Sequence, residues 1–312
     1  MKRKDLLDLR SADADEILYI MDTAASFREV LRRPVKKVPT LRGKSVATLF
    51  FEASTRTRTS FEAAAKILSA DTYSLAGSSS SIVKGESLKD TMLTLDAMGI
   101  DAFVIRHPSS GAAHLASRYV PTKPVINAGD GTHEHPTQGL LDLLTIRDAK
   151  GRVDGLEVAI VGDILHSRVA RSNIWGLHKL GARVRLVGPQ TLIPADAESL
   201  PVTVYTDLLK GLAGADVVNI LRIQLERQDA AYFPSVREYA RLFGVNRDKL
   251  KVCNAGVTVL HPGPMNRGIE IASALADDPE FSVITDQVTN GVAVRMATLF
   301  WLMGAASAPH GS

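Results

Sequence analysis

Short apolar runs alternate with helix-like patterns along most of the 312 residues. In the first half, strands are expected at 45–51, 72–75, 101–106 and 124–127, and helices at 13–33, 55–69, 87–98, 111–119 and 137–150. In the second half, strands are expected at 158–161, 183–187, 217–221 and 257–260, and helices at 167–180, 236–243 and 285–303. Strands that alternate with helices form parallel sheets with helical crossovers. The sequence therefore predicts an α/β protein with two doubly wound parallel-sheet domains.

The boundary between the domains is expected where the helical pattern 137–150 ends at Gly151. This gives a first domain at residues 1–148 and a second at 149–284. A chain of this length suits two domains, each with a core of its own. The tail from Ala305 to Ser312 is expected to be disordered.

Composition limits the classes of protein to consider. Apolar residues make up 45% and charged residues 23%, as in globular proteins, and no apolar run approaches the roughly 18–20 residues that span a bilayer. The basic start, Met1 to Lys4, is not followed by the apolar stretch of a signal peptide. The single cysteine, Cys253, excludes an internal disulfide and is expected to be a packed residue. We therefore expect a cytoplasmic protein that does not enter a membrane.

The net charge of +3 is mild. Basic residues gather between Arg28 and Lys37, but no aromatic residue lies among them. Segments that bind nucleic acid usually interleave aromatic residues with basic ones. A solvated helix end accounts for the cluster, and no nucleic-acid partner is expected.

The most informative motif, Ser54-Thr55-Arg56-Thr57, joins the strand at 45–51 to the helix at 55–69. The first turn of a helix offers unpaired backbone N–H groups and the positive end of the helix dipole. Hydroxyl groups and arginine at that point make a site for phosphate or another compact anion. A Ser/Thr N-cap with solvated arginines is the alternative that this segment alone leaves open.

Four further motifs follow in order. They are Lys84-Gly85-Glu86-Ser87, Val104-Ile105-Arg106-His107-Pro108, Asn127 to Gly131 with His135-Pro136-Thr137-Gln138, and His261-Pro262-Gly263-Pro264. In this order and spacing, the motifs resemble the aspartate and ornithine carbamoyltransferase family. The likeness runs from about Leu41 to Phe300 and is closest to the aspartate-specific bacterial members. In that family the last helix, here 285–303, packs back on the first domain.

The resemblance implies a carbamoyl phosphate site. Its residues are Ser54, Thr55, Arg56, Thr57, Ser80, Arg106, His135, Gln138, Gly263 and Pro264. The catalytic ones among them are Arg56, Thr57, Arg106, His135 and Gln138. Thr57, Arg106 and His135 polarise the carbonyl in that family, and Gln138 holds the carbamoyl NH2 together with the backbone carbonyls of Pro262 and Gly263. Ser81 stays open as an alternative to Ser80, and Gly263 stands where some members have leucine.

The resemblance also implies an aspartate site formed by Lys84, Arg168, Arg222 and Gln224. Arg168 matches the arginine for the α-carboxylate, and Arg222 and Gln224 match the residues for the side-chain carboxylate and amino group. Alternation places these last two on the same side of an extended segment. Glu52 and Arg227 match an ion pair that links the domains, although a surface role for Arg227 stays equally open. Because parallel sheets bind ligands at their carboxyl edges, we expect all motifs to meet in a cleft between the domains.

No cofactor and no metal are expected. His133-Glu134-His135 resembles a pair of metal ligands, but residues two apart point in different directions and Pro136 makes this a turn. No third group of Cys or His stands at metal-ligand spacing. Gly162-Asp163 follows an apolar strand but lacks the three-glycine dinucleotide fingerprint.

The function implied is carbamoyl transfer from carbamoyl phosphate to L-aspartate, giving N-carbamoyl-L-aspartate and phosphate early in pyrimidine synthesis. The alternatives are transfer to ornithine or another acceptor, and a non-catalytic anion-binding scaffold. Ornithine enzymes of the family usually carry a cysteine in the loop at 261–264, and this loop has none. The scaffold is disfavoured because Arg106, His135 and Gln138 are all present.

The resemblance further implies a homotrimer whose loop 78–85 brings a serine and Lys84 into the neighbouring active site. Composition alone favours a mobile surface loop there. No motif indicates whether a regulatory chain or a dihydroorotase joins the trimer, so both partners stay open.

Overall fold

The chain folds into two compact units in a computed structural model that describes residues 3–76, 86–224 and 235–304. Unit 1 comprises Met1–Leu141 and Thr289–Ser312, and unit 2 comprises Asp142–Val288. Both divisions fall inside helices, the first in α5 (Pro136–Lys150) and the second in α11 (Ile284–Met303). Residues 289–303 of the last helix therefore belong to the same unit as the N-terminal half of the chain.

Unit 1 is built on a parallel sheet of four strands in the order β2-β1-β3-β4. Its strands are β1 (Ser45–Phe50), β2 (Asp71–Ala76), β3 (Ala102–His107) and β4 (Val125–Asp130). Its helices, besides its parts of α5 and α11, are α1 (Ala14–Arg32), α2 (Thr55–Ile67), α3 (Leu88–Ala97) and α4 (Ala112–Tyr119). Each was predicted to within three residues at either end.

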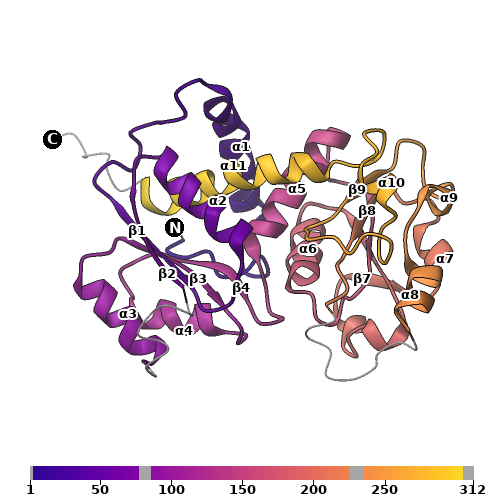
Figure 1. Ribbon diagram of the computed structural model, residues 1–312, viewed down its shortest axis with the longest axis horizontal. Helices are drawn as coiled ribbons and strands as arrows, with labels where there is room; N and C mark the ends of the chain where they lie inside the picture. The colour runs from indigo at the N-terminus through magenta and orange to yellow at the C-terminus, as the bar shows by residue number, and fades with distance from the viewer. Residues whose placement is uncertain (1–2, 77–85, 225–234, 305–312) are drawn as a thin grey trace. The chain divides into compact units, whose positions relative to one another are not determined.

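Alternating residues of the unit 1 sheet form a core on each face. Leu49 and Phe103 point toward α3 and α4, where they pack with Met92 and Ala116. Figure 1 shows these two helices together on one face of the sheet, and α2 on the other. Phe61 of α2 is fully buried.

The two ends of unit 1 meet in its core. The rings of Phe27 in α1 and Phe300 in α11 lie edge to face with centroids 5.8 Å apart. The Arg295 guanidinium of α11 lies 5.1 Å from the centre of the Phe61 ring, within the range of a cation–π contact. The last helix thus completes the core around the earliest helices of the chain.

The N-terminal segment extends the sheet beside β4. Leu6 pairs with Ile126 in a parallel bridge, donating to the Val125 carbonyl at 3.0 Å and accepting from the Asn127 N–H at 2.9 Å. Asp5 accepts from the Val125 N–H at 2.8 Å and from the Ser117 hydroxyl at 2.6 Å. These contacts tie the start of the chain to the strand from which the His135 loop begins.

Unit 2 is built on a second parallel sheet, of five strands in the order β7-β6-β5-β8-β9. Its strands are β5 (Glu157–Val161), β6 (Arg183–Val187), β7 (Val202–Tyr205), β8 (Val217–Ile220) and β9 (Thr258–Leu260). Its other elements are α6 (Arg168–Lys179), η2 (Gln190–Leu192), η3 (Ala197–Ser199), α7 (Leu208–Leu212), α8 (Val236–Phe243), α9 (Arg247–Leu250) and α10 (Ser273–Ala276). The prediction of parallel sheets is confirmed for both units.

The edge strand β7 and the short helices α7, α9 and α10 are elements that the sequence did not predict. Strand β7 lies at the end of the sheet and no residue in it is buried, so its sequence lacks the apolar run of a central strand. The helices have only four or five residues, too few for a periodic pattern. Among the described residues, no helix is long and apolar enough to cross a membrane.

Candidate active site

The predicted site residues of unit 1 lie at or just after the carboxyl ends of three adjacent strands, β1, β3 and β4. The chain leaves β1 for α2 and β2 on one side of the sheet, and β3 and β4 lie on the other side of β1. The strand order therefore reverses between β1 and β3. Ligands of open parallel sheets bind beyond the carboxyl ends of the strands at such a point.

The Ser54 turn begins helix α2 at the end of β1. Ser54 is the N-cap residue, yet its side chain forms no capping hydrogen bond to the first turn. The turn's backbone N–H groups are therefore not capped by this hydroxyl. Thr57 is buried, whereas Thr55 and Arg56 are exposed. The interpretation of this turn as an anion site stays a prediction.

Arg106, next to last in β3, is fixed by two neighbouring strands. Its Nη2 donates to Glu52 Oε1 at 2.7 Å, and its Nη1 donates to the Ala128 carbonyl at 3.2 Å. Its own carbonyl accepts from the Phe51 N–H at 2.9 Å. The guanidinium therefore lies just beyond β1, on the side where the Ser54 turn starts.

His135 immediately precedes α5 and is buried. Its carbonyl accepts from the Gln138 and Gly139 N–H groups at 2.9 and 3.2 Å, which fixes the start of the helix. Burial lowers the pKa of the His135 imidazole well below its usual 6.5, and the charges of Arg106 and Arg295 lower it further. The imidazole is therefore neutral at physiological pH and can donate one N–H without giving up a proton.

Arg295 is a charged residue near this site that the sequence analysis did not select. It is buried in α11, and its charge acts on His135. The sequence does contain a sign of its buried role, because Arg295 is the only charged residue between Thr289 and Met303. A lone arginine in an apolar helix indicates a buried role.

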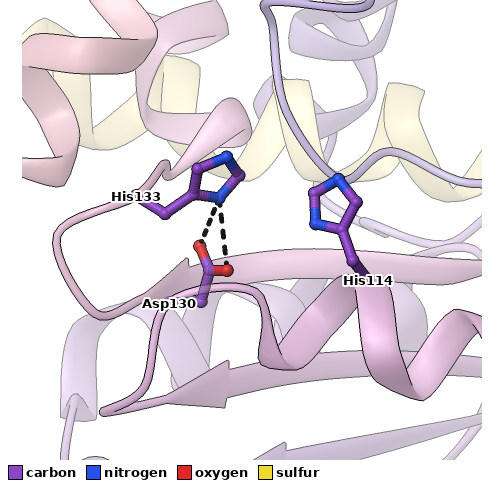
Figure 2. A group of neighbouring side chains, drawn as sticks. All are labelled: His114, Asp130 and His133. Carbon is purple, nitrogen blue, oxygen red and sulfur yellow. Dashed lines mark hydrogen bonds and ion pairs between the residues drawn. The ribbon is translucent and has the colours of Figure 1, made fainter.

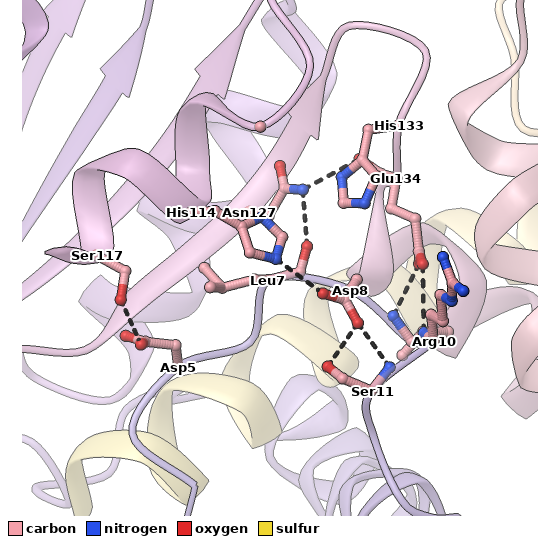
Figure 3. A network of polar contacts seen from close by, with 12 residues as sticks. Asp5, Leu7, Asp8, Arg10, Ser11, His114, Ser117, Asn127, His133 and Glu134 are labelled. Atoms are coloured by element: carbon pink, nitrogen blue, oxygen red, sulfur yellow. Dashed lines mark hydrogen bonds and ion pairs between the residues drawn. The ribbon is translucent and has the colours of Figure 1, made fainter.

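The loop that carries His135 is held by the N-terminal segment (Figure 3). The Glu134 carboxylate, which is buried, accepts from the backbone N–H groups of Leu9 at 2.7 Å and Arg10 at 3.2 Å. The Asn127 side-chain amide donates to the Leu7 carbonyl at 2.8 Å and to the Glu134 carbonyl at 3.3 Å. His135 is thus positioned by contacts on the residue before it.

The predicted site residues of unit 2 follow β5, β8 and β9, again on both sides of the point where strand order reverses. Arg168 is the first residue of α6 and is buried. The Asp163 carboxylate, fully buried at the end of β5, accepts from His166 Nδ1 at 2.8 Å and the Gln224 N–H at 3.4 Å. Gln224 Nε2 donates to the His166 carbonyl at 3.1 Å.

The segment after β8 has the alternation that the sequence predicted. Leu221 and Ile223 are buried, whereas Arg222 and Gln224 are partly exposed. These two polar residues therefore lie on the same side of the segment. The Asn266 amide, from the loop after β9, donates to the Ile223 carbonyl at 3.1 Å and ties the two loops together.

The loop His261 to Pro264 is organised around the His261 ring. Its Nδ1 accepts from the Gly263 N–H at 2.8 Å, and its Nε2 lies 3.2 Å from Glu270 Oε1. These contacts fit a neutral ring with its proton on Nε2. Gly263 and Pro264 belong to unit 2, unlike the other residues predicted to hold carbamoyl phosphate.

Several predicted residues lie outside the described part of the chain. They are Ser80, Ser81, Lys84 and Arg227. Glu52, the predicted partner of Arg227, contacts Arg106, and its pairing with Arg227 stays a prediction. The predicted roles of the serine and Lys84 of loop 78–85 in the neighbouring active site stay predictions.

Both halves of the chain match one protein family. The model of the aspartate/ornithine carbamoyltransferase carbamoyl-P binding domain matches residues 4–148, and that of the Asp/Orn binding domain matches residues 154–302. The chain belongs to the aspartate/ornithine carbamoyltransferase family. The resemblance found in the sequence motifs is confirmed.

Relatives within the carbamoyltransferase family are similar over nearly their whole length. The aspartate carbamoyltransferase catalytic subunit of Heliobacterium modesticaldum is 61% identical over 303 residues, 97% of this chain and 96% of that one. The corresponding subunit of Desulforamulus reducens is 60% identical with the same coverage.

Solved structures of the family share the fold. Ornithine carbamoyltransferase from Pyrococcus furiosus has a TM-score of 0.85 at 31% identity, over 97% of each chain. Aspartate transcarbamoylase from Trypanosoma cruzi, in complex with carbamoyl phosphate and aspartate, has a TM-score of 0.85 at 29% identity, over 96% of this chain and 97% of that one.

Proposed function

We propose that this chain transfers the carbamoyl group of carbamoyl phosphate to the amino group of L-aspartate. The observation that carries the proposal is the uncapped Ser54 turn beside a fixed Arg106, with a neutral His135 in the same unit. These groups suit a phosphate joined to a carbonyl carbon. The relatives named as aspartate carbamoyltransferase catalytic subunits support aspartate as the acceptor.

In this proposal the phosphate binds at the start of α2. The N–H groups of the first turn, the hydroxyls of Ser54, Thr55 and Thr57, and the Arg56 guanidinium provide donors for its oxygens. Arg106 spans the phosphate and the carbonyl oxygen. Its fixed position means that little reorganisation is needed when charge develops.

The carbonyl is polarised by Thr57, Arg106 and His135. Because the pKa of His135 is lowered, the ring acts as a neutral hydrogen-bond donor to the developing oxyanion. Gln138 and the backbone carbonyls of Pro262 and Gly263 hold the carbamoyl NH2. Burial is the main cause of the lowered pKa of His135, and the charges of Arg106 and Arg295 lower it further.

Aspartate binds through the residues of unit 2. Arg168 pairs with the α-carboxylate, and Arg222 and Gln224 hold the side-chain carboxylate and the amino group. The deprotonated amine attacks the carbonyl carbon, a C–N bond forms, and the C–O bond to phosphate breaks. Phosphate leaves and takes up the proton from the amine, so that no covalent enzyme intermediate is needed.

We further propose that the protein is a cytoplasmic homotrimer with shared active sites. Each chain contributes its Lys84 and Ser80 to the active site of the neighbouring chain. The family resemblance of the 78–87 segment supports it. Inactive Lys84→Ala and Arg56→Ala chains, mixed after reversible dissociation, should recover activity in mixed trimers. Mixed trimers that stay inactive would contradict sharing.

The central test compares acceptors. The purified chain with carbamoyl phosphate should form N-carbamoyl-L-aspartate from aspartate and should release phosphate much more slowly with ornithine. Arg56→Ala should lose about 2–4 kcal/mol of transition-state stabilisation while remaining folded. Preference for ornithine, or near-normal kcat/KM in Arg56→Ala, would overturn the assignment.

A further inference from the structure

Three potential metal ligands of unit 1 that have no role in the proposed reaction gather beside the loop that carries His135. His114 of α4, Asp130 at the end of β4 and His133 in the next loop offer ligand atoms that all lie within 4.8 Å of one another. Figure 2 shows the two imidazole rings beside the Asp130 carboxylate. The rings lie edge to face, with centroids 5.3 Å apart. Among the described residues, no other group of His, Cys, Asp and Glu is arranged in this way.

The Asp130 carboxylate is held rigidly by neutral donors. Its Oδ2 accepts from the Gly111 N–H at 2.7 Å, and its Oδ1 accepts from the Asn127 amide at 2.7 Å. The side chain is completely buried. Its Oδ1 also accepts from the Glu134 N–H at 3.3 Å. These bonds orient the carboxylate without neutralising its charge, and Oδ2 keeps a lone pair for a further partner. A buried, oriented anion of this kind favours a cation beside it.

His114 has an outer partner of the type seen at metal centres. Its Nε2 lies 3.0 Å from Asp8 Oδ2, the contact drawn in Figure 3. Asp8 is itself fixed by the Ser11 N–H at 2.6 Å. A histidine that donates one ring N–H to a carboxylate presents the other nitrogen as a ligand, in a fixed orientation. The Asp8 contact thus leaves Nδ1 of His114 to face the cluster.

His133 completes the set. Its Nδ1 lies 3.1 and 3.2 Å from the two Asp130 oxygens, so a metal ion there would replace the proton that these atoms share. The side chains of His114 and His133 are 39% and 32% exposed, which leaves one side open for a water ligand. Two imidazoles, one carboxylate and water form a tetrahedral set that suits zinc better than magnesium or calcium.

We propose that His114, Asp130 and His133 bind one Zn²⁺ ion, with Asp8 orienting His114. The ion would link α4, the end of β4 and the loop leading to His135, and so stabilise unit 1. Spacing along the sequence pairs His133 with His135 as candidate ligands. The fold instead brings His133 beside His114, which is far from it in sequence and was not selected.

The test measures metal binding directly. The full chain is freed of metal with a chelator, then titrated with Zn²⁺ by calorimetry and with Co²⁺, whose visible spectrum reports tetrahedral coordination. The wild type should bind one ion per chain, and Zn²⁺ should raise its Tm. His133→Gln and His114→Gln should lose affinity by about a hundredfold or more, and Asp8→Asn by about tenfold or more, the scale for an outer partner.

The matched control is His178→Gln, which removes an exposed histidine of unit 2 and should bind as the wild type does. Zn²⁺ affinity that is equal in the wild type, His114→Gln and His133→Gln would place the ion elsewhere and overturn the proposal. So would the absence of binding when Zn²⁺ is in large excess. Circular dichroism of each variant establishes that it is folded, and because activity is not the readout, the result is independent of the proposed reaction.

Discussion

The Arg106 guanidinium is held against the Glu52 carboxylate at 2.7 Å, and both side chains are largely buried. The pair joins the end of β3 to the turn after β1. We expect Glu52→Gln to keep an acceptor for Arg106 but to lose the charge that fixes it. The transition-state stabilisation calculated from kcat/KM should fall by about 1–2 kcal/mol, on the scale of a hydrogen bond to a charged group.

A matched control for this prediction is Glu62→Gln. The Glu62 carboxylate lies 3.8 Å from Arg58 within α2, a pair at helical spacing that contributes little. Its kcat/KM should stay at the wild-type value. If both variants behave alike, Glu52 does not position Arg106.

Arg222→Ala should weaken the binding of aspartate but not that of carbamoyl phosphate. Arg222 lies in the segment after β8 of unit 2, and its removal would leave an aspartate carboxylate without its charged partner. We expect the KM for aspartate to rise by about a hundredfold, whereas calorimetry should give an almost unchanged affinity for carbamoyl phosphate. A collapse of carbamoyl phosphate binding would contradict this assignment.

His135 predicts a specific dependence of stability on pH. Burial, with the charges of Arg106 and Arg295, lowers its folded-state pKa well below 6.5. In the unfolded chain the ring takes up a proton as the pH falls below 6.5, whereas in the folded chain it does not. Above pH 6.5 the ring is neutral in both states and its contribution to the free energy of unfolding is fully present. Below pH 6.5 that free energy falls, by at most about 1.4 kcal/mol per pH unit.

Urea unfolding at a series of pH values measures this effect. His135→Gln should show a shallower loss of stability below pH 6.5 than the wild type. The kcat/KM of the wild type should show no titration assignable to His135 near pH 6.5. Equal slopes for the two proteins would mean that folding does not lower the pKa of His135.

Cys253 should react slowly with alkylating agents. Burial raises the pKa of its thiol from 9.0 to about 11, although Arg185 partly opposes the change. The thiolate fraction near neutral pH is therefore about a hundredfold smaller than for an ordinary cysteine. Mass spectrometry should find slow labelling by iodoacetamide in the folded protein and rapid labelling in urea. Rapid labelling of the folded protein would contradict the raised pKa.

The sequence predicted those parts of the molecule that depend on local pattern. The central strands and long helices were found because their apolar residues repeat regularly, and Arg106 and His135 were found because they lie in motifs. The Glu52–Arg106 contact and the meeting of His114 with His133 were not, because each joins residues brought together only by the sheet. Strand β7 was missed because an edge strand carries no buried run.

The helix that completes unit 1 is separated from the rest of that unit by the whole of unit 2. Residues 289–303 bring Phe300 against Phe27 and Arg295 against Phe61. The unit whose first residues are synthesised earlier therefore stays unfinished until residues 289–303 have emerged, whereas unit 2 is complete once Val288 has emerged. The order in which the two units can reach their final form during translation is the reverse of their order of appearance.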